Sequence, residues 1–154
     1  MLFFGHIAAT LLVADATHSD RAAAVAGNLL PDITDKTLGW VLKLTPSRWL
    51  AHGLPGYFLA NVVAFTLLDR RRRRGFAFGY AGHLLCDLWA GGRVPWLAPF
   101  QEQPAKREKW GARRLALYLL PEVIGLPVTL RLLGQGTRNE EYRIRAANQR
   151  EQAP

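Results

Sequence analysis

The chain has 154 residues, a length that suits one domain with its own buried core. Its single cysteine, Cys86, excludes an internal disulfide bond, and residues 1–14 lack the basic start of a signal peptide, so none is expected. The formal net charge of +8 indicates an acidic partner, either an anionic lipid surface or a nucleic acid.

Four apolar blocks follow one another along the chain, at residues 2–14, 54–68, 75–100 and 115–133. Few segments alternate with a period of two residues, and Ala, Leu and Arg dominate, so the sequence predicts an all-α helical bundle. Residues 54–68 would form about 22 Å of helix, which is short of the roughly 30 Å hydrocarbon core. The bundle is therefore expected to be either membrane-embedded, with helices that line a polar cavity, or membrane-associated.

Basic residues gather beside the apolar blocks, at residues 70–74, 106–114 and 131–150. Arginines that flank apolar helices are typical of juxtamembrane segments, and the positive-inside bias places such loops on the cytoplasmic side. No aromatic residue or polar base reader is interleaved with residues 70–74, which makes nucleic acid the weaker interpretation. The expected partner is an anionic membrane lipid surface.

His83 and Asp87 lie four residues apart in a helical block, so both side chains project from one face of the helix. An imidazole nitrogen and a carboxylate oxygen at this spacing can bind one cation or two adjacent ones. A hydrogen bond between the two side chains would explain the pair equally well. If residues 69–74 form a tight connection between antiparallel helices, His52 would approach the same face.

Three of the four histidines lie beside glycine in apolar surroundings, where another backbone can approach closely: His6, His52 and His83. A second acidic pair, Asp32 and Asp35, lies at a predicted helix start. Helix capping and the helix dipole would account for both of these carboxylates.

Several short strings between residues 5 and 100 form a recognisable pattern. They are Gly27-Asn28-Leu29-Leu30-Pro31-Asp32, Arg48-x-x-x-His52, Gly82-His83-Leu84-Leu85-Cys86-Asp87 and Pro95-Trp96-Leu97-Ala98-Pro99-Phe100. Together with an early histidine, they resemble the inner-membrane metal-dependent hydrolases, a family defined by prediction. More distantly, that family resembles the helical zinc-dependent phospholipase C and nuclease group, which also uses a His-x-x-x-Asp helix at a multi-metal site.

The resemblance implies, position by position, six metal ligands and an arginine, Arg48, placed to meet an anionic group. The implied ligands are His6, Asp32, Asp35, His52, His83 and Asp87. Mixed imidazole and carboxylate ligands suit two zinc or manganese ions better than a closed structural zinc, which prefers cysteine. Two such ions would favour hydrolysis of a phosphoester by a bridging water, with Arg48 steadying the developing charge as a catalytic residue.

The chain departs from the family pattern at two places. The family often has Pro-Asp-x-Asp-His after the proline and His-Ser at the later site. Here Pro31 is followed by Asp-Ile-Thr-Asp-Lys, and His52 is followed by Gly53. The spacing of the second carboxylate and a hydroxyl role at position 53 therefore differ from the family.

The sequence thus favours a metal-dependent hydrolase at the inner membrane, acting on a phosphoester. Its helical metal-site domain would cover residues 1–133, followed by a polar charged tail over residues 134–154. Two other classes stay open. One is a non-enzymatic helical membrane protein with buried His–Asp pairs, and the other is a membrane-tethered basic regulator that contacts nucleic acid.

Overall fold

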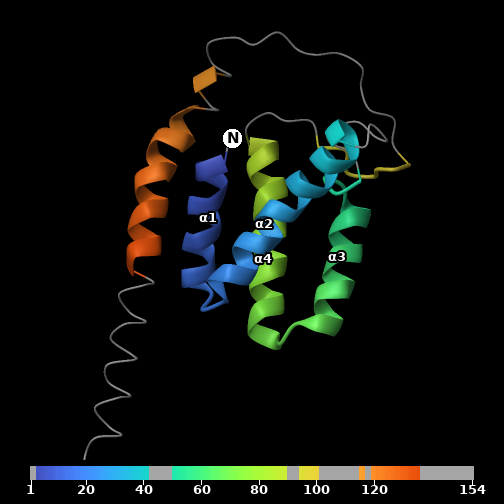
Figure 1. Ribbon diagram of the computed structural model, residues 1–154, viewed down its shortest axis with the longest axis horizontal. Coiled ribbons are helices and arrows are strands. Elements are labelled where there is room, and N and C mark those ends of the chain that lie inside the picture. Colours follow the sequence, from blue (N-terminus) through green and yellow to red (C-terminus); the bar gives the residue numbers. More distant parts are fainter. Residues whose placement is uncertain (1–2, 42–49, 90–93, 101–114, 117–118, 136–154) are drawn as a thin grey trace, which may run out of the picture.

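A computed structural model describes residues 3–41, 50–89, 94–100, 115–116 and 119–135 of the chain (Figure 1). All regular structure in these ranges is helical, which confirms the predicted all-α class. The elements are α1 (Phe3–Ala16), α2 (Arg21–Lys36), the short π-helix η1 (Thr37–Val41), α3 (Leu54–Leu67) and α4 (Arg70–Trp89). Residues 119–135 are also helical.

The helices form a bundle in which α2 crosses α4 at the centre, with α1 on one side and α3 on the other (Figure 1). The helix of residues 119–135 packs outside α1, where Leu132 joins Ile7 and Leu11 in a buried apolar cluster. A second apolar cluster contains Tyr80 and Leu84 of α4. The two clusters lie on either side of a polar interior, described below.

The crossing of α2 over α4 is close because small residues line both helices. A Cβ atom on Gly79 would overlap the carbonyl oxygen of Ala24, and one on Gly27 would overlap the carbonyl oxygen of Phe76. Only glycine lets the two backbones approach to this distance. The crossing therefore sets how α2 and α4 face each other at the site.

The structure corrects the expectation of a helix start at Asp32 and Asp35. Helix α2 begins at Arg21, where the Asp20 carboxylate accepts a hydrogen bond from the N–H of Ala23 at 2.8 Å. Asp32 and Asp35 lie in the last two turns of the helix, and Pro31, a residue typical of first turns, lies inside it. Their carboxylates therefore do not cap a helix.

The arginine run is also helical, so the expected loop over residues 70–74 is wrong. The Asp69 carboxylate accepts hydrogen bonds from the N–H groups of Arg71 and Arg72 at 2.9 and 3.0 Å and so caps α4. Arginine is a good helix former, which lets the run form the first turns of α4. The basic clusters of residues 106–114 and 136–150 lie outside the described residues, as does the tail from residue 136.

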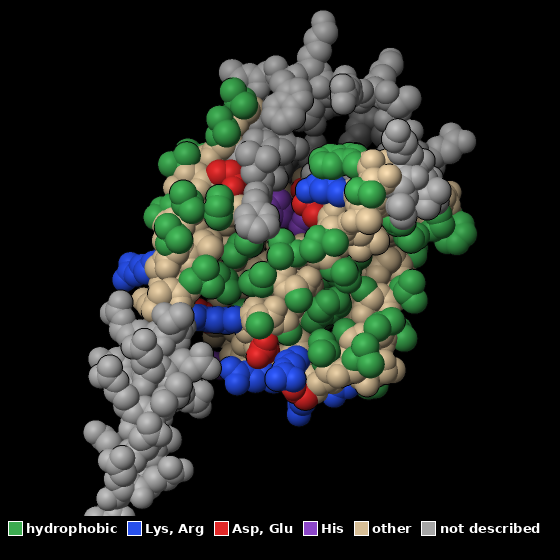
Figure 2. Space-filling view, viewed as in Figure 1, with side chains coloured by type: hydrophobic (Ala, Val, Ile, Leu, Met, Phe, Trp, Pro, Cys, Tyr) green, Lys and Arg blue, Asp and Glu red, His purple; other side chains and the backbone are tan. Residues whose placement is uncertain are grey.

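The described surface is unusually apolar. On α3, Phe58, Val62, Phe65 and Leu67 are between 61% and 76% exposed. Large apolar side chains are also exposed along the helix of residues 119–135. Figure 2 shows hydrophobic side chains spread over the face of the molecule in view. Monomeric soluble proteins rarely expose apolar patches this large, so the surface marks a contact with a membrane or a protein.

In the described part of the chain, no helix is both long enough and apolar enough to cross a membrane. The apolar helices α1 and α3 have 14 residues each, or about 21 Å.

Candidate metal centre

Four segments of the chain bring imidazole and carboxylate groups together at one end of the bundle. Helix α1 carries one of these residues, α2 carries two, the turn before α3 carries one and α4 carries two. They are His6, Asp32, Asp35, His52, His83 and Asp87, and all except Asp32 are buried. The six residues that the sequence singled out as ligands are therefore neighbours in the structure, whereas Arg48 lies outside the described residues.

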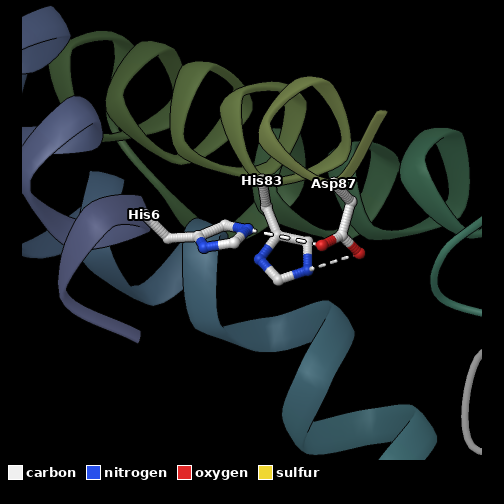
Figure 3. Close-up of side chains that lie close together, drawn as sticks. All are labelled: His6, His83 and Asp87. Atoms are coloured by element: carbon white, nitrogen blue, oxygen red, sulfur yellow. Dashed lines mark ion pairs between the residues drawn. The ribbon is translucent and has the colours of Figure 1, made fainter. Parts of the chain in front are cut away.

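His83 and Asp87 project from one face of α4, as their spacing predicts, and His6 points toward them from α1 (Figure 3). The Nε2 atom of His83 lies 3.9 Å from Oδ2 of Asp87. That separation is too long for a hydrogen bond. The intrahelical hydrogen bond that the sequence left open therefore does not explain this pair.

The Asp87 carboxylate lies between histidines from two different segments. Its Oδ1 atom is 3.5 Å from Nε2 of His6, and its Oδ2 atom is 3.6 Å from Nε2 of His52. Each oxygen thus faces a different part of the cluster. A carboxylate in this position can bind two cations, one through each oxygen.

The donor atoms are spaced like ligands around an ion. The Nε2 atom of His52 lies 3.3 Å from Nε2 of His83 and 3.5 Å from Oδ1 of Asp32. Four tetrahedral ligands at about 2.0–2.2 Å from one metal lie about 3.3–3.6 Å from each other. The separations around His52 therefore match the edges of a tetrahedral site.

Two groups of donors can be distinguished among the described residues. One contains His6, His83 and Asp87, and the other contains Asp32, His52 and His83. Within each group the ligand atoms all lie within 4.8 Å of one another. The groups share His83, and Asp87 of the first group also lies 3.6 Å from His52 of the second, so the two candidate sites adjoin each other. A neutral imidazole binds a metal through its one unprotonated nitrogen, so His83 can serve only one of the two sites at a time.

Asp35 belongs to neither group and lies behind His52. Its Oδ2 atom is 2.7 Å from Nδ1 of His52, and its Oδ1 atom accepts a hydrogen bond from the N–H of Ala51 at 3.0 Å. Tyr80 fixes the same turn, because its hydroxyl donates to the carbonyl oxygen of Ala51 at 2.6 Å. Such outer carboxylates orient the imidazole ligands of metal sites. The geometry thus favours a positioning role for Asp35.

Glu122 holds the first turn of α1, which carries His6. From the sequence, Glu122 is either an acid in the first turn of its own helix or a further residue of the site. Its carboxylate accepts hydrogen bonds from the N–H groups of Phe4 and Gly5, at 2.7 and 3.1 Å, directly before His6. Gly125, one turn further along, packs against Gly5. The Pro121 that precedes Glu122 favours the first of these interpretations. A contact across 118 residues has no local signal.

The protonation states of the cluster suit metal binding. Burial, together with a smaller effect of the nearby His6, lowers the pKa of His83 to about 4, so the imidazole is neutral at neutral pH. For Asp32, burial opposes ionisation, but the interactions with His52 and Lys36 outweigh it and hold the pKa of the carboxyl well below its usual range. Metal ligands must be neutral imidazoles and ionised carboxylates, which is the state of His83 and Asp32.

Comparison with known proteins gives one family. Residues 1–148 match the family described as YdjM inner membrane protein. No curated protein and no solved structure matches the chain.

Proposed function

The chain belongs to the YdjM inner membrane protein family, and from that premise we propose that it is a membrane-associated, metal-dependent hydrolase of a phosphoester. The observation that supports the proposal most is the spacing of the nitrogen and oxygen donors around His52 and Asp87. The separations of 3.3, 3.5 and 3.6 Å match the edge of a tetrahedral metal site, and those from His52 to the two carboxylates are longer than an ordinary hydrogen bond.

The donor set suits zinc or manganese. All the donors are imidazole nitrogens or carboxylate oxygens, whereas a closed structural zinc site prefers cysteine sulfur. One ion would be held by Asp32, His52 and His83, and a second by His6 and Asp87. When bound, two such ions supply Lewis acids and lower the pKa of a coordinated water.

The residues around the donors orient them for metal binding. A carboxylate only accepts hydrogen bonds, so the His52 ring carries its proton on Nδ1, toward Asp35, and presents the lone pair of Nε2 to the cluster. Burial of His83 and Asp87 excludes bulk water from their side of the centre. Arg48, which the family resemblance places near the site, is proposed to steady an anionic group there.

Association with a membrane is supported by the surface of the molecule. The apolar side chains of α3 and of residues 119–135 would contact lipid, and the arginines at the start of α4 would contact anionic headgroups on the cytoplasmic side. Figure 2 shows basic side chains gathered at the end of the molecule remote from the histidines. The metal centre and the arginine cluster therefore lie at different ends of the bundle.

A second candidate is favoured by one contact. The short hydrogen bond between His52 and Asp35 is what a buried structural pair would form in a non-enzymatic helical membrane protein. That class predicts a protein in which the histidines and carboxylates stabilise the bundle and hold no metal.

Elemental analysis of the detergent-purified protein separates the two functions. We expect bound zinc or manganese that is lost in His83→Ala and Asp87→Ala, and a melting temperature that falls when a chelator is added. His18→Asn is the matched control, because His18 is exposed and has a φ of 51°, which asparagine tolerates. A protein that purifies without metal and takes up neither ion would rule out the hydrolase. Turnover of para-nitrophenyl phosphate or its diester would then establish catalysis.

A further inference from the structure

Lys36 lies at the edge of the metal centre, one turn beyond Asp32 on α2. Its Nζ atom is 2.7 Å from Oδ2 of Asp32, whose other oxygen is 3.5 Å from Nε2 of His52. A single carboxylate therefore separates the lysine ammonium from the donor atoms. Nothing in the family resemblance assigns a role to this lysine.

The centre reaches the surface at this pair. The side chains of Asp32 and Lys36 are 32% and 43% exposed, whereas those of His52 and Asp87 are 1% and 2% exposed. Figure 2 shows histidine recessed beside an acidic and a basic side chain. A molecule that approaches the centre from this side would meet Lys36 on its way.

The balance of charge indicates what kind of molecule that is. Asp32, Asp35 and Asp87 carry three negative charges, and Lys36 carries one positive charge. Two divalent ions would supply four more positive charges, which leaves two in excess at a partly buried site. A dianion such as a phosphate group neutralises that excess.

Lys36 has free donor capacity for this anion. An ammonium group has three N–H donors, and the ion pair with Asp32 uses one of them. The ammonium also lies beside an exposed aromatic ring: Nζ is 5.9 Å from the ring centroid of Trp40, which is 66% exposed. The lysine thus presents a charged head at an apolar rim.

We propose that Lys36 binds the phosphate group of the substrate at the mouth of the metal centre and so selects an anionic phosphoester. This inference rests on the proposed metal-dependent function, and it adds the residue that recognises the substrate. The shared chemistry is the phosphate itself, whether its ester group belongs to a lipid or to a soluble molecule.

Calorimetric titration of inorganic phosphate into the metal-loaded, detergent-purified protein tests the proposal. We expect Lys36→Gln to weaken phosphate binding roughly 10- to 100-fold, because a charge-assisted hydrogen bond is lost. Lys36→Arg keeps the charge and should retain most of the affinity. Arg21→Gln is the matched control, since it likewise removes the positive partner of an ion pair, with Asp15, about 17 Å along α2 from Asp32, and should bind phosphate like the wild type.

Metal content, measured on each variant, keeps the outcomes distinct. If the wild type takes up no metal, the proposed function itself has failed. If Lys36→Gln keeps its metal and binds phosphate as tightly as the wild type, Lys36 has no part in recognition. If Lys36→Gln loses metal as well as phosphate affinity, the lysine only positions Asp32, and the inference is overturned.

Competition identifies the source of the phosphate. Bound inorganic phosphate should be displaced by phosphatidic acid in mixed micelles, and phosphatidylcholine micelles serve as the blank. Displacement by phosphatidic acid at lower concentration than by glycerol phosphate assigns a lipid-borne phosphoester. The reverse order assigns a soluble one, and displacement by neither contradicts phosphate recognition at this site.

Discussion

The Nδ1 atom of His52 lies 2.7 Å from Oδ2 of Asp35, and both side chains are fully buried. Because a carboxylate accepts hydrogen bonds and cannot donate them when ionised, this contact decides which ring nitrogen carries the proton. The other nitrogen, Nε2, then faces Asp32 and His83 with its lone pair. One hydrogen bond thus sets both the tautomer and the direction of a candidate ligand.

We therefore expect Asp35→Asn to weaken zinc or manganese binding about 10- to 100-fold, the usual effect of losing an outer carboxylate at a metal site. Competition with a chromophoric chelator measures the affinity. Asp15→Asn removes the same charge from an ion pair with Arg21 that is about one-third exposed, and it should leave metal affinity unchanged. Equal affinities for Asp35→Asn and the wild type would show that Asp35 does not orient His52.

Glu122→Ala should destabilise the protein and loosen the His6 side of the centre. Removing the acceptor of the Phe4 and Gly5 N–H groups is the loss of a helix cap with favourable charge, which costs about 1–2 kcal/mol. Denaturant unfolding in detergent measures the free energy. Glu122→Gln keeps one acceptor oxygen and should fall between alanine and the wild type. Identical unfolding curves for all three would contradict the capping role.

The glycines of α4 offer a pair of substitutions with opposite outcomes. Gly79→Ala would force a Cβ atom into the carbonyl oxygen of Ala24, push α4 away from α2 and destabilise the protein by about 1–3 kcal/mol. Gly82→Ala meets only Oγ1 of Thr10 at 4.0 Å and should stabilise α4 by up to about 1 kcal/mol. Thermal unfolding with and without metal compares the two. Equal effects would mean that the helix crossing is not tight.

The buried His83 predicts a pH dependence for the metal-free protein. Its pKa is about 4 in the folded state, against an ordinary value of 6.5, so the unfolded chain binds more protons between these values. The free energy of unfolding should therefore fall as the pH drops from 6.5 to 4, by on the order of 3 kcal/mol, and this contribution should level off below pH 4. Denaturation in chelator across this range measures the slope. His83→Gln should have a shallower slope, and an equal slope would assign the effect to other groups.

Local sequence signals were enough for the helical class and for the His83–Asp87 face. Helix-forming residues dominate the chain, and a spacing of four residues places two side chains on one face whatever the surrounding fold. A local signal gave a wrong prediction at Asp32, where the sequence indicated the start of a helix. Aspartate followed within a turn by a second aspartate resembles a helix start, but the cap of α2 is Asp20, and burial decides the roles of the later carboxylates.

Contacts between distant segments could not be predicted in this way. The role of Asp35 depends on the turn that carries His52, and the role of Glu122 depends on α1. Neither pair is linked by periodicity or by a motif. The tight crossing at Gly79 and Ala24 is likewise a property of two helices together, and a glycine in a helical segment predicts only a local weakness of that helix.

The contact between Glu122 and the first turn of α1 also imposes an order on biosynthesis. The ribosome synthesises α1 first, and the helix of residues 119–135 is the last of the described helices to emerge. The N–H groups at the start of α1 therefore gain their carboxylate partner, Glu122, only late in translation. Asp32, His52 and His83 can meet before then, whereas His6 is not yet held in place. Under the proposed metal-dependent function, a nascent chain would therefore assemble the donors Asp32, His52 and His83 before His6 is held in place.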